Sequence, residues 1–312
     1  MSGAVVAAPD VGVAISTKDR PDALERCLEA LWRGSLRPRE IVVVDQSGDD
    51  RTERVVRAKI SEGMPILYER AEPRGLGASQ NVAFSRATAR VIAVTDDDCI
   101  ADELWLEVIA RTMADDTTLD AMAGRVLALP AEGDRSWPVS LRTTTMRADF
   151  QGYAPPWNVG SGNNFAMRRH AYTRIGGCDE RLGPGSPSRG GVDMDLFYRL
   201  LRAGGRVRYE PDAVVHHERQ RYAERLARRP MYGRGMGACV ALRMRDGDVM
   251  SARLLADWIL LRLRMLARAA TRADLRGLRE ELTMLRSTIG GLAHGLRASA
   301  RPVMPLALRA AL

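Results

Sequence analysis

Alternating strand-like and helix-like segments constrain the fold of this chain more than any other feature. Short apolar runs rich in β-branched residues, typical of buried strands, occupy residues 11–15, 41–44, 66–68 and 91–95. Segments with apolar residues at helical spacing lie between them, at residues 21–33, 52–60 and 77–89. This order predicts an α/β fold with a mainly parallel central sheet covered by helices on both faces.

Polar side chains follow three of the predicted strands. Residues 16–17 come directly after the first strand, Asp45 after the second, and three consecutive aspartates, residues 96–98, after the fourth. Because ligands of such sheets bind at the carboxyl ends of the strands, we expect these side chains to share one crevice. Asp45 has two interpretations: it accepts a hydrogen bond from a nucleotide base, or it caps the turn at residues 46–48.

The three aspartates of residues 96–98 repel one another unless a cation or a basic group lies among them. Hard oxygen ligands of this kind suit Mg²⁺ or Mn²⁺, which also bind diphosphate oxygens. A solvated acidic turn or a helix N-cap is the alternative. The apolar strand immediately before the run directs it toward the ligand crevice, which favours a metal site.

The first strand-to-helix turn, residues 16–20, contains no glycine. A dinucleotide-binding loop and a P-loop both need glycines at this point, so a Rossmann dehydrogenase and a P-loop kinase are disfavoured. A sugar-phosphate nucleotidyltransferase would need a glycine-rich basic loop here, which this turn does not supply either.

Seven short motifs follow one another along the chain. They occupy residues 16–17 together with 45–47, and then residues 74–81, 96–98, 162–169, 176–180, 191–196 and 211–217. In this order they resemble the inverting family 2 glycosyltransferases of the GT-A fold. The resemblance covers residues 11–217, about two thirds of the chain. It implies transfer of a sugar from a nucleotide-sugar donor to a hydroxyl acceptor.

The resemblance also implies which residues hold the donor. Thr17 and Asp45 would lie against the nucleotide base, and Arg74 would lie near the nucleotide. Asp96 would contact the ribose or the sugar. The donor would be a UDP-, GDP- or dTDP-sugar, and the motifs do not distinguish among the three.

For the reacting end of the donor, the resemblance implies a metal and a base. Asp98 would be the principal ligand of Mn²⁺ or Mg²⁺, and His217 matches a metal-ligating or pyrophosphate-facing histidine. Because neighbouring strand residues face opposite sides, only one of His216 and His217 can face the site. The alternative is that both are surface histidines at a strand end. Asn163 and Asn164 would face donor sugar and acceptor, and Asp193 would be the catalytic base.

One position departs from the family pattern. The family usually has glutamate before the catalytic aspartate, and this chain has Val192. One base is chemically sufficient for inversion, because only the acceptor hydroxyl must lose a proton. Asp195 is a second candidate base, although its position favours a structural carboxylate at the start of a helix. Val192 also motivates an alternative function, a nucleotide-sugar-binding scaffold with little or no turnover.

The basic charge of the chain is concentrated in its last third. Residues 219–312 contain 19 arginines and 7 acidic residues, whereas residues 1–218 contain 28 basic and 32 acidic ones. Residues 254–269 predict a basic amphipathic helix that is too short and charged to span a membrane. Its apolar arc of roughly 60° contains Leu254, Trp258, Leu261 and Met265. The charge favours an anionic membrane surface as its partner, with packing onto the chain's own domain as the alternative.

We therefore predict a GT-A catalytic domain over residues 1–218 and a basic helical extension over residues 219–312. The domain would divide into a nucleotide-binding half, residues 1–125, and an acceptor half, residues 126–218. A glycan or a lipid-linked molecule is the expected acceptor, in cell-surface glycan or glycolipid biosynthesis. No signal peptide is evident, and no aromatic stacking platform accompanies the basic tail, so we expect a cytoplasmic enzyme, peripheral on the inner face of the cell membrane, without a nucleic-acid partner.

Overall fold

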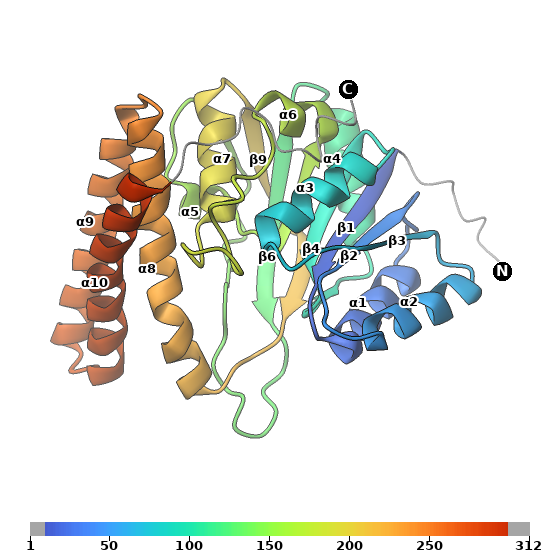
Figure 1. The fold of residues 1–312 in the computed structure, drawn as a ribbon, viewed down its shortest axis with the longest axis horizontal. Helices are drawn as coiled ribbons and strands as arrows, with labels where there is room; N and C mark the ends of the chain where they lie inside the picture. Colours follow the sequence, from blue (N-terminus) through green and yellow to red (C-terminus); the bar gives the residue numbers. More distant parts are fainter. Residues whose placement is uncertain (1–9, 299–312) are drawn as a thin grey trace.

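A computed structural model describes residues 10–298 (Figure 1). Residues 1–9, where we expect no signal peptide, and residues 299–312, the end of the basic extension, lie outside the described part. The strands are β1 (Val11–Thr17), β2 (Ile41–Asp45), β3 (Ile66–Arg70), β4 (Val91–Asp96), β5 (Cys99–Ala101), β6 (Ala121–Ala128), β7 (Ala148–Gln151), β8 (Asn164–Arg168) and β9 (Arg206–His217). The first helices are α1 (Pro21–Arg33), α2 (Arg51–Ser61), α3 (Leu76–Arg86), α4 (Trp105–Asp115), α5 (Pro156–Val159), α6 (Arg169–Arg174) and α7 (Val192–Arg202). All strands and helices predicted within residues 11–95 are confirmed.

The strands form one mixed sheet in the order β3-β2-β1-β4-β8-β6-β9-β5, with β7 paired to β9. Strands β1 to β4 pair in parallel, and β8 is antiparallel to both β4 and β6. The predicted α/β class is therefore confirmed. In the register, Ser16 lies opposite Asp96 and Thr17 opposite Asp45. The carboxyl ends of β1, β2 and β4 thus meet at one edge, as the sequence predicts.

Alternate residues of the parallel strands enter two separate cores. Val13 and Ile15 pack with α1, α2 and α4, whereas Ala14 packs on the other face with α3 and α7. This alternation follows from the two-residue period of a strand, and it explains why the strands are apolar on both sides.

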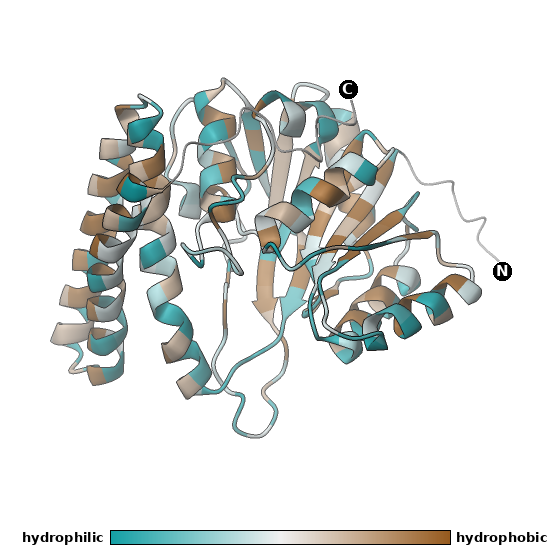
Figure 2. Cartoon of the chain, viewed as in Figure 1, coloured by the Kyte–Doolittle hydropathy of each residue, from teal (hydrophilic) through white to brown (hydrophobic). Residues whose placement is uncertain are grey.

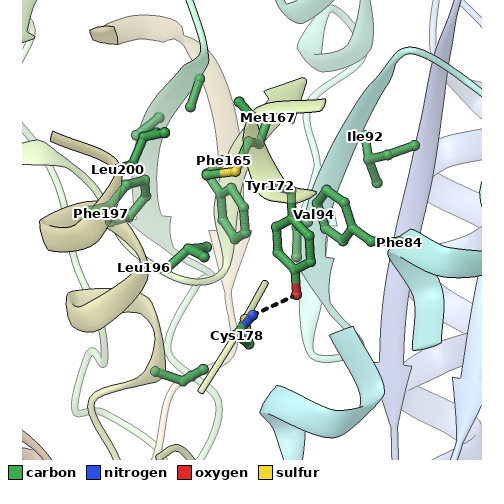
Figure 3. Close-up of a cluster of buried hydrophobic side chains, with 14 of the residues drawn as sticks. Phe84, Ile92, Val94, Phe165, Met167, Tyr172, Cys178, Leu196, Phe197 and Leu200 are labelled. Atoms are coloured by element: carbon green, nitrogen blue, oxygen red, sulfur yellow. Dashed lines mark hydrogen bonds between the residues drawn. The ribbon is translucent and has the colours of Figure 1, made fainter. Parts of the chain in front are cut away.

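The core on the α3 side supports the later motifs (Figure 3). The rings of Phe84 on α3 and Tyr172 on α6 stack with centroids 3.7 Å apart. The Tyr172 hydroxyl donates to Asn81 Oδ1 at 2.8 Å and accepts a hydrogen bond from the Cys178 backbone N–H at 3.2 Å. Burying an aromatic side chain of this size contributes about 1.5–3 kcal/mol. The loop at residues 176–180 is thereby held next to α3.

The second half of the chain departs from expectation in its strands. The family motif at residues 211–217 lies in the second half of one long strand, β9, which passes through Pro211. A register shift between Gly124 and Arg125 of β6 absorbs the proline, because a bulge tolerates a residue without a backbone donor. Strand β6 was not expected, since alanine and glycine have low strand propensity. Helix α7 begins at Val192, so Asp195 lies at the start of a helix, as the sequence predicts.

Three long helices form the C-terminal extension: α8 (Tyr222–Arg245), α9 (Met250–Thr271) and α10 (Leu275–Arg297). Figure 1 shows them stacked at the side of the molecule opposite α1 and α2. Glycines allow α8 and α10 to approach backbone to backbone, since a Cβ on Gly237 would lie 2.1 Å from the Thr288 carbonyl oxygen. A Cβ on Gly291 would meet the Arg234 carbonyl oxygen at the same distance.

The apolar arc predicted on the amphipathic helix packs against the protein itself. Leu254 and Trp258 of α9 are buried with Tyr198, Met236 and Met284 in a third core. The packing alternative is therefore correct for Leu254 and Trp258, whereas membrane association of the extension stays a prediction. Met265, at the end of the same arc, is exposed. None of the helices within residues 10–298 combines the length and the apolarity that crossing a bilayer requires.

Candidate active site

A cavity of about 700 Å³ opens where β1 and β4 end. Its lining comes mainly from the strand ends with the acidic run, the start of α3, the turn at residues 161–163, the loop at residues 184–191 with the start of α7, and the facing sides of α8, α9 and α10. The volume lies within the range of small-ligand sites. Residues 162 and 193, far from the acidic run in sequence, reach the same space because β8 pairs directly with β4.

The acidic run is held in place by residues of the first strand-to-helix turn. The Thr17 hydroxyl donates to Asp97 Oδ2 at 2.8 Å. The Arg20 guanidinium donates to Asp97 Oδ1 at 2.9 Å and to Asp98 Oδ2 at 2.8 Å. Burial and the neighbouring carboxylates raise the pKa of Asp96 well above its ordinary value. Thr17 thus lines the cavity, but its hydroxyl is engaged by Asp97.

Arg20 is a site residue that the sequence reasoning missed. It supplies the basic group that three neighbouring carboxylates require, and it does so from the turn that faces them across β1 and β4. The sequence did contain a signal for such a residue, because a buried acidic run must have a cationic partner within a few ångströms.

Asp98 and His217 form a pair that fits a divalent cation. Strand β5 places Cys99 opposite His217 of β9, and the Nε2 atom of His217 lies 3.4 Å from Asp98 Oδ1. That oxygen is buried and has no hydrogen-bond partner among the described residues. The Nδ1 atom of His217 lies 2.7 Å from the Glu218 carbonyl oxygen, an arrangement that leaves Nε2 as a lone-pair donor to a metal. His216, its strand neighbour, does not line the cavity.

Asp193 lies at the first turn of α7, on the opposite wall of the cavity. Its Oδ2 accepts a hydrogen bond from the Gly162 backbone N–H at 3.1 Å. A side chain at residue 162 would collide with it, since a Cβ there would lie 2.9 Å from the Asp193 Cβ. Burial raises the pKa of Asp193, although hydrogen bonds from backbone N–H groups oppose the shift. A carboxylate with a raised pKa in a cavity is suited to accept a proton.

Both carboxylate oxygens of Asp195, the second candidate base, form ion pairs within the protein. It is fully buried, and its oxygens pair with Arg199 at 2.7 Å and with Arg243 at 3.2 Å. Arg243 also pairs with Asp179 at 2.6 Å, so these charges tie α7 to α8 and to the loop before it. Asp195 does not line the cavity, which leaves Asp193 as the base candidate of α7.

Two of the predicted nucleotide contacts, Asp45 and Arg74, do not line the cavity. Asp45 is fully buried, and its two oxygens accept from the Ser47 N–H and the Tyr68 hydroxyl, each at 2.8 Å. It therefore caps its turn, the alternative interpretation. Arg74 is exposed and pairs with Glu180 at 2.5 Å.

The two asparagines of the turn before β8 have different roles. Asn164 joins three elements, because its side chain accepts from the Trp105 indole N–H and donates to the carbonyls of Arg125 and Ala213. It is a structural residue rather than a sugar contact. Asn163 lines the cavity, and its buried Nδ2 has no hydrogen-bond partner among the described residues. An unpaired buried donor of this kind is suited to bind a ligand oxygen.

Comparison with known proteins agrees with this geometry. The Pre-mycofactocin glycosyltransferase of Mycobacterium tuberculosis is 29% identical over 264 residues, which cover 81% of this chain and 52% of that protein. This chain thus spans about half the length of that curated relative. The succinoglycan biosynthesis protein ExoM of Rhizobium meliloti is 26% identical over 215 residues, 66% of each chain.

A solved structure shows the same fold. It is a mannosyltransferase from Pyrobaculum calidifontis in complex with GDP-Man and Mn²⁺, with a TM-score of 0.61 at 20% identity, over 94% of this chain and 90% of that one. The family model described as glycosyl transferase family 2 matches residues 12–176, more than half of the chain and the whole of the acidic run. The chain belongs to glycosyl transferase family 2.

Proposed function

We propose that this chain is a metal-dependent inverting glycosyltransferase that moves a sugar from a nucleotide-sugar donor to a hydroxyl. One observation carries the proposal: a single cavity holds both the Asp98 oxygen beside His217, which has no hydrogen-bond partner among the described residues, and the half-buried Asp193 carboxylate. The first arrangement suits a cation that binds diphosphate, and the second suits a base. The relatives that carry names in glycan biosynthesis support the same conclusion.

In the proposed reaction, Asp193 removes the proton from the acceptor hydroxyl while that oxygen bonds to the anomeric carbon. The bond from this carbon to the diphosphate breaks on the opposite face, so the configuration inverts. Asp98 and His217 would hold Mn²⁺ or Mg²⁺, which when bound neutralises charge on the departing diphosphate. Lys18 and Arg189 also line the cavity, and within residues 10–298 neither forms an ion pair, so both can contact phosphate oxygens.

Donor binding is expected to depend on the metal. At a donor concentration of 100 times Kd, binding stabilises the folded protein by about 2.7 kcal/mol, which raises Tm by several degrees. We expect this shift with Mn²⁺ and one of UDP-, GDP- or dTDP-sugars, and its loss when EDTA replaces Mn²⁺. Thermal-shift measurements that include the free nucleoside diphosphates as controls identify which nucleotide base the protein binds. Equal Tm values with and without every donor would contradict the proposed function.

We also propose that the enzyme is peripheral on an anionic membrane and acts on a glycan or lipid-linked acceptor. The support comes from an exposed face of α10 and not from the apolar arc predicted within residues 254–269. Exposed apolar side chains recur every seven residues along α10, at Leu275, Leu282, Ile289 and Leu296. Arg279 and Arg286 flank this row four residues after two of its members. An apolar row with arginines beside it is suited to a surface of anionic lipids. Figure 2 shows hydrophobic and hydrophilic residues following one another along the stacked helices of the extension.

Flotation tests the membrane proposal. We expect the full chain to float with vesicles containing phosphatidylglycerol, and to stay in the dense fraction with phosphatidylcholine vesicles. The double variant Leu282→Ser with Ile289→Ser removes exposed apolar surface only, so it should keep its Tm and lose flotation. The buried core is untouched in both proteins. Flotation that is equal in parent and variant, or a change of oligomeric state instead of flotation, would contradict this assignment of α10.

A further inference from the structure

The cavity continues past Asp193 to a wall that the helical extension builds. Aromatic and thioether side chains from four helices form it: Trp157 of α5, Met194 of α7, Tyr232 and Met236 of α8, and Trp258 of α9. Trp157 and Trp258 lie with ring centroids 5.5 Å apart at an interplanar angle of 59°. The Trp258 indole N–H donates to Thr288 Oγ1 at 3.0 Å, which fixes the ring. This wall is rigid and apolar, and it lies next to the base.

Arginines supply the polar groups of the same wall. Arg262 lies over the Trp258 ring, 4.5 Å from its centroid, and pairs with Glu281 at 3.2 Å. Its Nε is buried and has no hydrogen-bond partner in the described part of the chain. Arg228 lines the cavity and forms no ion pair with any residue between 10 and 298. The wall therefore offers uncommitted N–H donors.

The charged groups that α8–α10 contribute to the wall are all cationic. Sugar hydroxyls donate hydrogen bonds and need acceptors, whereas a guanidinium only donates. Within the described residues, no Asp or Glu of α8–α10 lines the cavity; Glu280 and Glu281, which lie behind the lining, pair with Arg229 and Arg262, two arginines that do line it. Phosphate and carboxylate oxygens accept hydrogen bonds and match guanidinium geometry. The apolar rings and thioethers match an apolar or aromatic body.

We propose that this wall is the acceptor site and that it takes an anionic amphiphile. The apolar body of the acceptor lies on Trp157 and Trp258, its phosphate or carboxylate binds Arg228 and Arg262, and its hydroxyl faces Asp193. This inference rests on the proposed glycosyltransferase function and specifies its acceptor class. Lipid-linked sugar phosphates and small aromatic acids that carry a hydroxyl share this chemistry.

Binding of matched probes tests the acceptor class. Isothermal titration of the full chain, saturated with Mn²⁺ and the nucleoside diphosphate that binds it, compares phenyl phosphate with benzyl alcohol and decyl phosphate with decyl glucoside. We expect each phosphate to bind at least about tenfold tighter than its neutral partner, because charge-assisted hydrogen bonds are lost in the latter. Tight binding of decyl phosphate alone identifies a lipid phosphate; tight binding of phenyl phosphate alone identifies a small aromatic acid. Both results support the proposal.

Substitutions assign the effect to the wall. Arg228→Gln should weaken binding of both phosphates about tenfold and leave nucleotide binding unchanged, whereas Arg264→Gln, an exposed arginine of α9 outside the cavity, should change neither. Equal affinity for charged and neutral probes, or no effect of Arg228→Gln on phosphate binding, overturns the acceptor class while nucleotide binding still supports the proposed function. Failure of the nucleoside diphosphates to bind in the first place overturns the proposed function itself.

Discussion

Replacing Asp193 by asparagine is expected to lower kcat by about 10²–10⁴-fold while the fold and donor affinity stay unchanged. The side chain is the half-buried carboxylate on the wall facing the acidic run, and the Gly162 N–H donates to its Oδ2 at 3.1 Å. Asparagine has nearly the same shape and can accept the same hydrogen bond through its amide oxygen, but it cannot take up the acceptor's proton. Initial rates of sugar transfer and of donor hydrolysis with Mn²⁺ measure the loss.

The pH dependence follows from the environment of the same group. Because burial raises the pKa of Asp193, and a base must be ionised to act, the transfer rate of the parent should fall as pH decreases through that raised pKa. The acidic limb of the rate profile should therefore lie above the ordinary aspartate range. Asp193→Asn should lose this limb along with its activity.

Asp195→Asn is the matched control, since it lies two residues further along α7. It removes a buried charge from the Arg199 and Arg243 pairs, so it should lower Tm through an uncompensated buried cation and spare the chemistry of the molecules that remain folded. Turnover of Asp193→Asn equal to that of the parent would remove Asp193 from the mechanism. Donor binding without turnover in the parent would favour the scaffold function that Val192 suggests.

Asp98→Asn is expected to reduce Mn²⁺ affinity by at least about 100-fold and to abolish metal-stimulated transfer. The Asp98 Oδ1 atom is buried, unpartnered and 3.4 Å from His217 Nε2, so it is the oxygen most suited to bind a cation. Titration of Mn²⁺ by electron paramagnetic resonance measures the affinity without relying on activity. Mn²⁺ should raise Tm in the parent and leave Tm of the variant unchanged.

Asp97→Asn provides the comparison for the metal prediction. Thr17 and Arg20 already occupy the oxygens of Asp97, so this variant should keep a response of Tm to Mn²⁺. The metal-free Asp98→Asn protein should fold at least as well as the parent, because one of three mutually repelling carboxylates is gone. Parent and Asp98→Asn proteins with the same Mn²⁺ affinity would rule out Asp98 as the metal ligand.

At the strand ends, the sequence pattern predicts which residues come together but not how each side chain is oriented. The period of apolar residues predicts β1, β2 and β4, and the rule that parallel strands end at one edge correctly brings residues 16–17 and 96–98 together. The same rule brings Asp45 to that edge but does not say which way its carboxylate turns. Tyr68, on the neighbouring strand β3, hydrogen-bonds one of its oxygens, and such a side-chain partnership has no signature in sequence spacing.

Long-range partnerships account for the other differences. Arg20 and Asp98 are 78 residues apart, and Asn164 joins Trp105 and Ala213 across three elements. A motif residue such as Asn164 was assigned to the ligand because its motif matches, whereas its hydrogen bonds are all made within the protein. Only the packed structure distinguishes a polar group that is satisfied from one, like Asn163 Nδ2, that is left to bind something else.

The sequence by itself determined the secondary-structure order, the family motifs and the presence of an amphipathic helix with Leu254 and Trp258 on one face. These depend on neighbours within a few residues, where the geometry of a strand or a helix dictates which side chains share a side. Only the tertiary structure decided that this face packs inside the protein, with Trp258 beside Asp193 in the cavity wall. It also decided that the apolar row of α10 is the one that stays exposed. The hydrophobic effect requires apolar surface to be buried but is not directional, so it cannot specify the partner surface before the chain has folded.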